Sequence, residues 1–344
     1  MYFLISIPTE AFYRVMALRR FHRQLGAAIS VTRDAATLLQ QVRGSFGGRL
    51  VLVDWRRGEV LADKPLLGAA GLGIDGRTIV TSSWIEPYLY VMADGQEVGR
   101  VTNRWFNYIH SVELTAPQRA LVACAGSDLI AEIAFDGEVV WDWFGPEHGY
   151  DTRTDGTPAF FDRHADYRAI RVGTADQAMH VTSALTMPDG TILATLFHQG
   201  VLIAIERNSG SARVVLDGLS KPHGVHTRDG GFLLSDTLGH RIVLLDDRLR
   251  VCSEISVGSQ WLQDSLVTSA GTYLTLENVH IDQGPQGELC NRITEIDEAG
   301  RRLRSVEIGV DFRLFTAREI DESFAGTLAR AWGRSGSCDT WRWH

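Results

Sequence analysis

The chain has 344 residues, of which 44% are hydrophobic, and it carries a formal net charge of −8 at pH 7. This length and apolar content are enough to bury a core, and no low-complexity linker divides the chain, so we expect one domain over 1–344. An acidic chain without a basic face excludes the phosphate backbone of nucleic acids as the expected partner. We expect a small-molecule substrate, and the sequence leaves open whether a protein partner exists.

The N-terminal segment MYFLISIPTEAF contains an apolar run of only five residues, with no basic region before it and no small-residue cleavage site after it. It therefore predicts neither a signal peptide nor a membrane span. The cysteines Cys124, Cys252, Cys290 and Cys338 show no Cys-x-x-Cys spacing, which favours buried free thiols. We expect a cytoplasmic protein without a membrane partner.

From Leu50 onward, one pattern occurs six times at a spacing of about 40 residues: an apolar strand, an acidic or glycine-containing turn, and a second apolar strand. Another apolar hairpin signal precedes each copy. The outer turns lie at Asp54, Asp94, Asp136, Arg207, Asp246 and Asp297, and the inner turns lie near Asp34, Asp75, Gln118, Asp189, Asp229 and Ala270. Four antiparallel strands repeated six times, with little helical periodicity, predict an all-β six-bladed β-propeller.

The two ends of the chain determine how this ring closes. The first inner hairpin is expected at 27–42, in AAISVTRDAATLLQQV. The apolar segment 324–332 is expected either to pair with the N-terminal strand YFLISI and close six blades, or to form most of a seventh blade.

Two of the intervals between repeats contain insertions, at 145–178 and at 278–291. If the strands of each blade are lettered A to D outward from the axis, the first insertion connects a D strand to the next A strand, and the second connects a B strand to a C strand. Both connections emerge on the same rim, which we call the functional rim. Long loops usually carry function, so we expect these two to cover the central opening.

Three consecutive blades have a histidine near the start of the innermost strand on the functional rim. These are His110 in FNYIHSVEL, His180 in AMHVTSAL and His223 in KPHGVH. Converging neutral imidazoles are suitable ligands for a divalent metal, and catalytic zinc sites typically combine three protein ligands with one open position. The pattern predicts one divalent ion on the axis, zinc first, with iron or calcium as alternatives. The alternative is a metal-free channel in which the histidines form hydrogen bonds only with water and the backbone, and the sequence does not decide between the two.

Further candidate catalytic residues lie near the same rim. Tyr108 lies two residues before a predicted metal ligand, so on a strand it would face the same way and could donate a proton. Asp236 and Glu277 end B strands, where a carboxylate could orient a histidine or act as a general base. Tyr167 and Arg168 belong to the large insertion and could reach into the pore.

Two further residues are expected to have lesser roles. His226 lies three residues after His223, so strand alternation predicts that it faces away from the axis. Asp264, which begins another innermost strand, is expected to complete the polar lining.

Two segments and the set of three axial histidines resemble known propeller families. KPHGVHTRDGGFLLSDTLGHRIVLLD resembles the NHL-type repeat, and the wider pattern is similar to the SMP-30/gluconolactonase-like superfamily, which includes calcium-dependent lactonases. The three axial histidines resemble those of peptidyl-hydroxyglycine lyases, and this implies that His110, His180 and His223 hold zinc and that Tyr108 is the acid–base group. GEVVWDWFGPEHG is similar to a motif of arylsulfotransferase-like propellers, in which a pore histidine accepts the transferred group.

The sequence therefore predicts a metal-dependent hydrolase or lyase that acts on a small organic substrate at the central pore, with the metal as a Lewis acid. One alternative is a metal-free transferase that uses a nucleophilic pore histidine. The other is a non-catalytic NHL-like scaffold that binds its partner on the rim.

Overall fold

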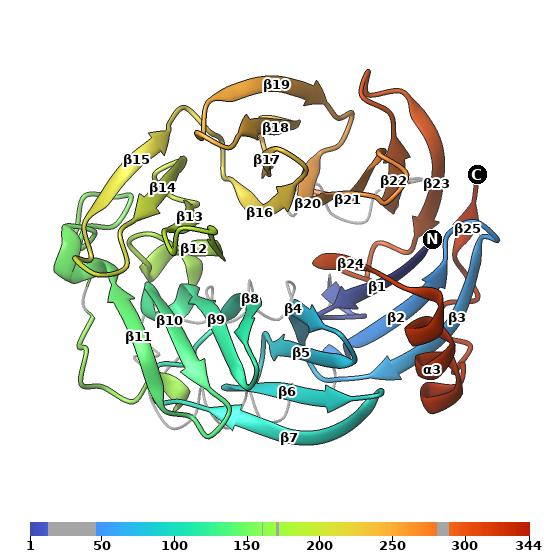
Figure 1. Cartoon of the computed structure of the whole chain (residues 1–344), viewed down its shortest axis with the longest axis horizontal. Helices are drawn as coiled ribbons and strands as arrows, with labels where there is room; N and C mark the ends of the chain where they lie inside the picture. The colour runs from blue at the N-terminus through green and yellow to red at the C-terminus, as the bar shows by residue number, and fades with distance from the viewer. Residues whose placement is uncertain (13–45, 160, 170–171, 281–288) are drawn as a thin grey trace, which may run out of the picture.

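The computed structural model of the protein describes residues 1–12, 46–159, 161–169, 172–280 and 289–344. In this part of the chain, six antiparallel sheets surround a central axis, as Figure 1 shows. Five sheets have four strands, and the sixth has an additional short strand at its outer edge. The protein is an all-β six-bladed β-propeller, as the repeat predicts, and the alternative of seven blades is wrong.

Five of the blades are built from consecutive strands, with the innermost strand first in the chain. The first two of these sheets contain β4 (Ala69–Asp75), β5 (Thr78–Ser83), β6 (Tyr88–Ala93) and β7 (Gln96–Thr102), and β8 (Ile109–Ala116), β9 (Arg119–Cys124), β10 (Leu129–Ala134) and β11 (Val139–Phe144). The next two contain β12 (Val181–Thr186), β13 (Ile192–Leu196), β14 (Val201–Ile205) and β15 (Ala212–Leu216), and β16 (His223–Arg228), β17 (Gly231–Asp236), β18 (Arg241–Asp246) and β19 (Val251–Ser256). The last contains β20 (Trp261–Val267), β21 (Tyr273–Asn278), β22 (Asn291–Ile296), β23 (Arg302–Ile308) and the outer β25 (Arg342–Trp343).

The remaining blade joins both ends of the chain in one sheet. Its strands, from the axis outward, are β24 (Thr316–Ile320), β1 (Tyr2–Ile7), β2 (Arg49–Asp54) and β3 (Glu59–Pro65). β24 pairs antiparallel with β1, with Arg318 opposite Leu4. The inner hairpin predicted at 27–42 lies outside the described residues, and β24 and β1 occupy the two inner positions of this blade. Backbone pairing between the two ends therefore closes the ring.

The segment 324–332, predicted to be the closing strand, is helical instead. It lies in α3 (Glu322–Trp332), where the Asp321 carboxylate caps the helix by accepting a hydrogen bond from the Phe324 amide at 2.8 Å. Phe324 and Leu328 have the spacing of one helix face, and this face packs on the closing blade. No helix in the described ranges combines the length and the apolar character needed to cross a membrane.

The hydrophobic core lies between neighbouring blades. One cluster joins Val80 of β5 and Val91 of β6 to Val122 of β9 and Ala131 of β10. Because the broad faces of the blades bury most of the apolar side chains against one another, the innermost strands are free to present polar groups to the axis. The site described below depends on these polar groups.

Five of the six innermost strands share an irregularity of register near their first residues. Pairing with the second strand of the blade shifts between Ala69 and Leu72, Ile109 and Ser111, Val181 and Ser183, His223 and Val225, and Leu262 and Asp264. A bulge interrupts the regular alternation of side chains, so residues on either side of it that would face apart can face the same way.

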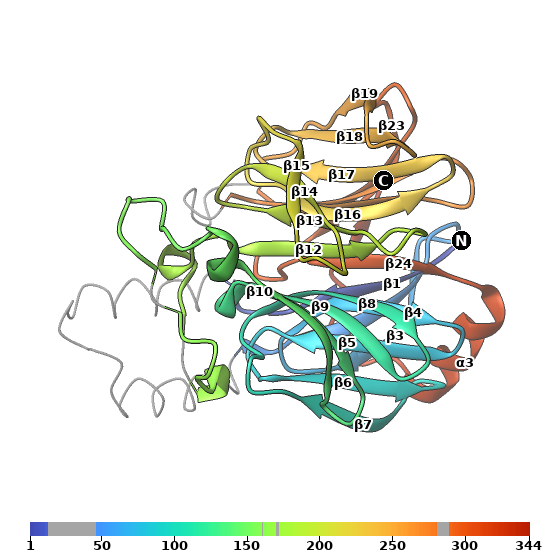
Figure 2. The same cartoon turned by 60° about the vertical axis from the view of Figure 1, so that its left-hand side comes forward.

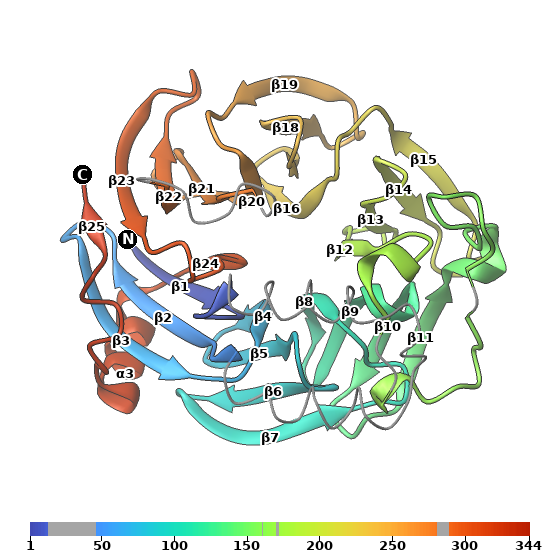
Figure 3. The same ribbon diagram turned by 180° about the vertical axis from the view of Figure 1, so that it is seen from behind.

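Both insertions leave the propeller at the predicted connections. Segment 145–178 links β11 to β12, and segment 278–291 links β21 to β22, although 281–288 lie outside the described residues. Figure 2 shows the described part of the first segment projecting from one rim near β11 and β15, and Figure 3 views the ring from that rim. The short 3-10 helices are η1 (Ala125–Ser127), between β9 and β10, and η2 (Gly145–His148), η3 (Tyr167–Ala169) and η4 (Thr174–Asp176), within the first insertion.

All four cysteines are free thiols, as predicted. Cys124 and Cys338 are buried, whereas Cys290 is partly buried and Cys252 is exposed. The expectation of burial is wrong for Cys252 because it lies on β19, the outermost strand of its blade, where only one side is covered.

Candidate functional site on the propeller axis

A cavity of about 330 Å³ follows the axis. Residues from the innermost strands of all six blades, β4, β8, β12, β16, β20 and β24, line it. This volume is near the lower end of the range of about 300–1,000 Å³ that is typical of small-molecule sites. His110, His223 and Phe315 lie at the end of the cavity toward the functional rim, because the innermost strands start there.

The three predicted metal ligands come together beside this end, where His110 and His223 line the cavity and His180 contacts His110 without lining it. The ring centroid of His110 lies 4.7 Å from that of His180 and 5.8 Å from that of His223. Their exposed fractions are only 5%, 4% and 4%, in the order His110, His180, His223. Across the described residues, no group of three or more His, Cys, Asp and Glu side chains has a geometry that could hold a metal ion.

A buried carboxylate positions His180. This histidine lies directly before β12 with a φ of +51°, in the left-handed region that non-glycine residues rarely adopt. The Asp128 carboxylate stabilises the turn by accepting hydrogen bonds from the amides of Ala178 (2.6 Å), Met179 (3.1 Å) and His180 (2.8 Å). Burial raises the pKa of Asp128 to about 7, although these three hydrogen bonds act in the opposite direction.

The imidazoles of His180 and His223 are each anchored through Nδ1. His180 Nδ1 contacts Oε1 of Gln177, and His223 Nδ1 lies 2.8 Å from Oγ1 of Thr237 and 3.1 Å from the carbonyl oxygen of Lys221. Because the amide and carbonyl oxygens only accept, Nδ1 carries the proton and Nε2 keeps its lone pair. Burial lowers the pKa of His223 to about 4 and holds the pKa of His180 well below its usual value. Both rings are therefore neutral at pH 7.

His110 differs from these two because neither of its ring nitrogens has a hydrogen-bond partner within the described structure, although both are buried. Burial, assisted by neighbouring His223, holds its pKa well below the usual value, so this ring is also neutral. A buried polar atom without a partner costs free energy, about 1–3 kcal/mol. His110 is therefore the ring with the most to gain from a ligand.

Aromatic side chains enclose this cluster. The ring centroid of Tyr108 lies 5.0 Å from that of His110 and 5.8 Å from that of His180, and Trp84 stacks on Tyr108 at 5.2 Å. Tyr108 therefore lies beside the histidines, as predicted. It does so from a left-handed turn with a φ of +52°, just before β8, rather than by alternation along a strand.

The other predicted catalytic residues have local partners. The Asp236 carboxylate accepts hydrogen bonds from Arg241 Nε (2.8 Å) and Ser220 N (2.6 Å), and Glu277 accepts one from Thr275 Oγ1 (2.7 Å). In the described part of the chain, no hydrogen bond, ion pair or ring contact joins either carboxylate to the three histidines. Their predicted role in the site has no contact to support it.

Tyr167 anchors the large insertion on the propeller, whereas Arg168 has its partner within the insertion. Tyr167 is buried in the core cluster around β8 to β10, and its carbonyl oxygen accepts a hydrogen bond from Asn107 Nδ2 at 2.8 Å. Arg168 is exposed and forms an ion pair with Asp166 at 2.6 Å. Neither residue lines the axial cavity.

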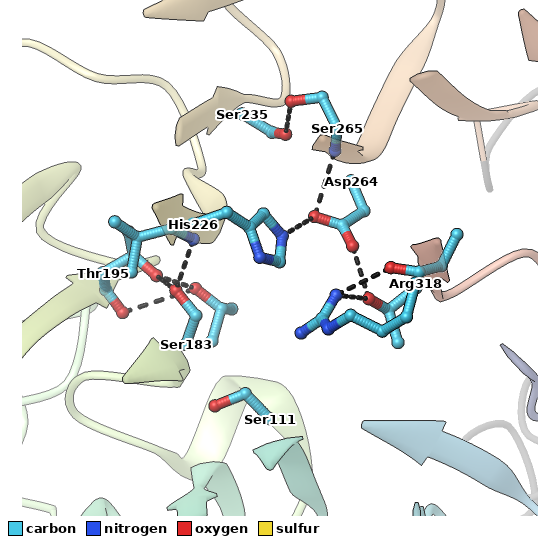
Figure 4. A network of polar contacts seen from close by, with 12 residues as sticks. Ser111, Ser183, Thr195, His226, Ser235, Asp264, Ser265 and Arg318 are labelled. Atoms are coloured by element: carbon cyan, nitrogen blue, oxygen red, sulfur yellow. Dashed lines mark hydrogen bonds and ion pairs between the residues drawn. The ribbon is translucent and has the colours of Figure 1, made fainter. Parts of the chain in front are cut away.

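A second polar group lines the cavity further along the innermost strands from the functional rim, and Figure 4 shows its contacts. His226 Nε2 lies 2.7 Å from Asp264 Oδ1, and the other Asp264 oxygen accepts a hydrogen bond from the Thr316 hydroxyl. Arg318 Nη1 donates to the same Thr316 hydroxyl at 3.0 Å. Burial alone would raise the pKa of Asp264, but His226, Arg318 and Thr316 together hold it below the usual value.

The expectation that His226 faces away from the axis is wrong. The register shift between His223 and Val225, with Gly224 at a φ of +40°, interrupts the alternation, so both histidines line the cavity. Sequence reasoning also missed Arg318, because the predicted closing segment began six residues later, at Phe324. The apolar residues of LFTAREI, just before that segment, do not alternate regularly and are only a weak signal for β24.

No family model matches the chain, and no curated protein matches it. Among solved structures, a protein of unknown function from Bacteroides caccae is 16% identical with a TM-score of 0.57, over 78% of this chain and 93% of that chain. A chain of a nidogen/laminin complex is 12% identical with a TM-score of 0.57, over 92% and 97%. A streptogramin B lyase is 11% identical with a TM-score of 0.50, over 78% and 76%. At these identities the likeness shows the propeller fold alone, and that fold is shared with an enzyme.

Proposed function

We propose that the protein is a metal-dependent enzyme, a hydrolase or lyase, that acts on a small organic substrate in the axial cavity. His110, His180 and His223 would hold one divalent ion at the functional-rim end after a movement of their rings, since the described structure does not place three such side chains in an arrangement that could hold a metal ion. The observation that carries this proposal is the cluster of three buried, neutral imidazoles, two of which line the polar cavity, with both nitrogens of His110 left without a partner among the described residues.

The chemistry of the donor set fits zinc or iron better than calcium. Proteins commonly orient a metal-binding imidazole by a hydrogen bond to its other ring nitrogen, and both His180 and His223 have such a bond at Nδ1. Imidazole suits zinc and iron, whereas calcium prefers six to eight oxygen ligands. When bound, such an ion would supply a Lewis acid that polarises a carbonyl group or activates water.

The residues of the chain would supply the proton transfers. Tyr108, in ring contact with His110 and His180, would donate a proton to the leaving group. In the deeper part of the cavity, Asp264 accepts the Nε2 proton of His226, which leaves Nδ1 of that ring as a possible general base. The aromatic rings of Trp84, Phe197 and Phe315 would restrict the access of water to this end.

A metal-free transferase is the second candidate, and the His226–Asp264 pair favours it. A carboxylate that holds one nitrogen of an imidazole fixes its tautomer and orientation, which is how nucleophilic and general-base histidines are prepared. In this alternative, His226 accepts the transferred group at Nδ1 and the histidines at the rim only shape the cavity.

Substituting single histidines separates the candidates. In a screen of esters, lactones, amides and sulfate esters, a metalloenzyme should lose bound metal and turnover together in His180→Ala and keep its metal in His226→Ala. A histidine transferase should lose turnover in His226→Ala, with no metal to lose in either variant. If both variants retained turnover, both candidates would be contradicted. If the wild-type protein had no activity in the screen but bound a partner on its rim, it would be a scaffold.

A further inference from the structure

Arg318 brings a positive charge into the axial cavity that no carboxylate in the described structure neutralises by direct contact. It lies in the middle of β24 and lines the cavity. Its Nη1 donates to Thr316 Oγ1 at 3.0 Å and to the carbonyl oxygen of Ala317 at 2.8 Å, and both acceptors are neutral. Within the described residues, Nε and Nη2 have no acceptor. One edge of the guanidinium therefore remains available to a ligand.

The two carboxylates that act electrostatically on this charge, Asp264 and Glu113, are engaged elsewhere. Asp264 accepts hydrogen bonds from His226 and from the Thr316 hydroxyl. Glu113 accepts from both the amide and the hydroxyl of Thr186, each at 2.8 Å, and burial raises the pKa of Glu113. A guanidinium stays charged in proteins, and a buried charge without a close partner is costly. An anionic ligand would remove that cost.

Ser111, on β8, adds a donor from another innermost strand that lines the cavity. Its Oγ accepts a hydrogen bond from the Ala184 amide at 3.0 Å, which leaves the hydroxyl proton free to be donated. Figure 4 shows the Ser111 hydroxyl and the Arg318 guanidinium on two sides of the same space, with His226 and Asp264 above them. The cavity thus combines a guanidinium edge, which matches the two oxygens of a carboxylate, with a hydroxyl donor.

We propose that the axial cavity binds the carboxylate of a small organic acid, with Arg318 and Ser111 as the donors. A carboxylate is expected rather than a phosphate, because Asp264 and Glu113 line the same cavity and would repel a dianion more strongly. The cavity volume of about 330 Å³ limits the ligand to a small molecule. This site goes beyond the proposed function, since it requires neither a metal nor a reaction. If both proposals hold, the acid is the substrate or product.

The test is a comparison of butyrate with butyramide, its neutral analogue, by ligand-observed NMR titration of protein freed of metal by chelation. Wild type should bind butyrate at least about tenfold more tightly than butyramide, because charge-assisted bidentate pairing is lost with the amide. Arg318→Gln should remove that preference, Arg318→Lys should keep part of it, and Ser111→Ala should weaken butyrate binding without abolishing it. Inorganic phosphate should not displace butyrate.

The matched control is Arg302→Gln, which removes the same charge from an exposed position on the outer strand β23 and should bind butyrate as wild type does. Equal binding of butyrate and butyramide by wild type would overturn the proposal even if Arg318→Gln failed to fold. Butyrate binding that survives in Arg318→Gln, or that appears only after metal is added, would also overturn it. Metal content measured on the untreated samples reports separately on the three rim histidines, so either proposal can fail alone.

Discussion

Nε2 of His226 lies 2.7 Å from Oδ1 of Asp264, in the wall of a cavity that also contains Arg318. Two innermost strands, β16 and β20, contribute these side chains. The pair therefore connects neighbouring blades as well as lining the site, and its loss should affect both stability and function.

Asp264→Ala should lower the free energy of unfolding at pH 7 by about 3–5 kcal/mol, the usual effect of removing one partner of a buried pair. The pKa of Asp264 in the folded protein lies below its usual value, so its contribution to stability is present above the unfolded pKa and is lost as pH falls through the folded pKa. Urea unfolding of wild type and variant from pH 7 down to pH 2.5 should show the two curves converging in acid. A difference that does not change with pH would contradict this assignment.

Asp128→Asn should change the pH dependence of stability in the opposite direction. Burial raises the pKa of Asp128 in the folded protein to about 7. Its contribution to stability is therefore full below the unfolded pKa and is lost as the pH rises through the folded pKa. Relative to the variant, wild type should lose stability between about pH 4 and pH 7 in urea unfolding. An identical pH dependence for both proteins would disprove the shift.

Asp128→Ala tests the positioning role of the same residue. Alanine leaves three backbone amides without their acceptor and disfavours the left-handed φ of +46° at this position. Asparagine keeps this φ, and its one oxygen can accept from the two amides that share Oδ2, but its NH2 group then faces the His180 amide. We expect Asp128→Ala to bind zinc about 10- to 100-fold more weakly, as for the loss of other groups that orient a metal ligand. Competition with a zinc chelator measures this, and Asp128→Asn, which can keep two of the three hydrogen bonds, should lie between Asp128→Ala and wild type.

His223→Gln should remove part of the acid sensitivity of the metal-free protein. The folded pKa of His223 is about 4, so its contribution to stability is present above the unfolded value near pH 6.5 and is lost as pH falls toward 4. Relative to His223→Gln, wild type should become less stable between these two values. Thermal unfolding in a series of buffers measures the difference, and a wild type that gained stability in this range would contradict the prediction.

Tyr108→Phe should separate catalysis from binding. The variant keeps the ring that contacts His110 and His180 but loses the phenolic proton, so it should keep its metal. Turnover of a substrate found in the screen should fall by about 10²- to 10⁴-fold, the usual contribution of a general acid. Full turnover in this variant would leave Tyr108 with a packing role only.

The repeat in the sequence was sufficient to predict six antiparallel blades and the connections that contain both insertions. The position of the closing strand was not predicted. α3 and β24 are adjacent in the sequence, and α3 is the more apolar of the two. The strand is recognised only by its pairing with β1. Local hydrophobicity does not show which terminal segment meets the other end of the chain.

The cluster at the rim was predictable because it needs only one histidine near the start of each of three consecutive innermost strands. The deeper part of the site was not, because it depends on a bulge at Gly224 that turns His226 toward Asp264, and on a closing strand that brings in Arg318. Carboxylates at the ends of B strands looked equivalent in the sequence. Their hydrogen bonds to Arg241 and Thr275 became visible only in three dimensions.

The metal content of untagged wild type, measured by plasma mass spectrometry after dialysis against zinc, tests the central claim most directly. The matched variants are His110→Ala and His240→Ala, which removes an exposed histidine outside the cavity. The account predicts about one bound ion per chain in wild type and in His240→Ala, and none in His110→Ala, as for a site with three protein ligands. A wild type that binds no metal, or a His110→Ala variant that retains it, would contradict the account.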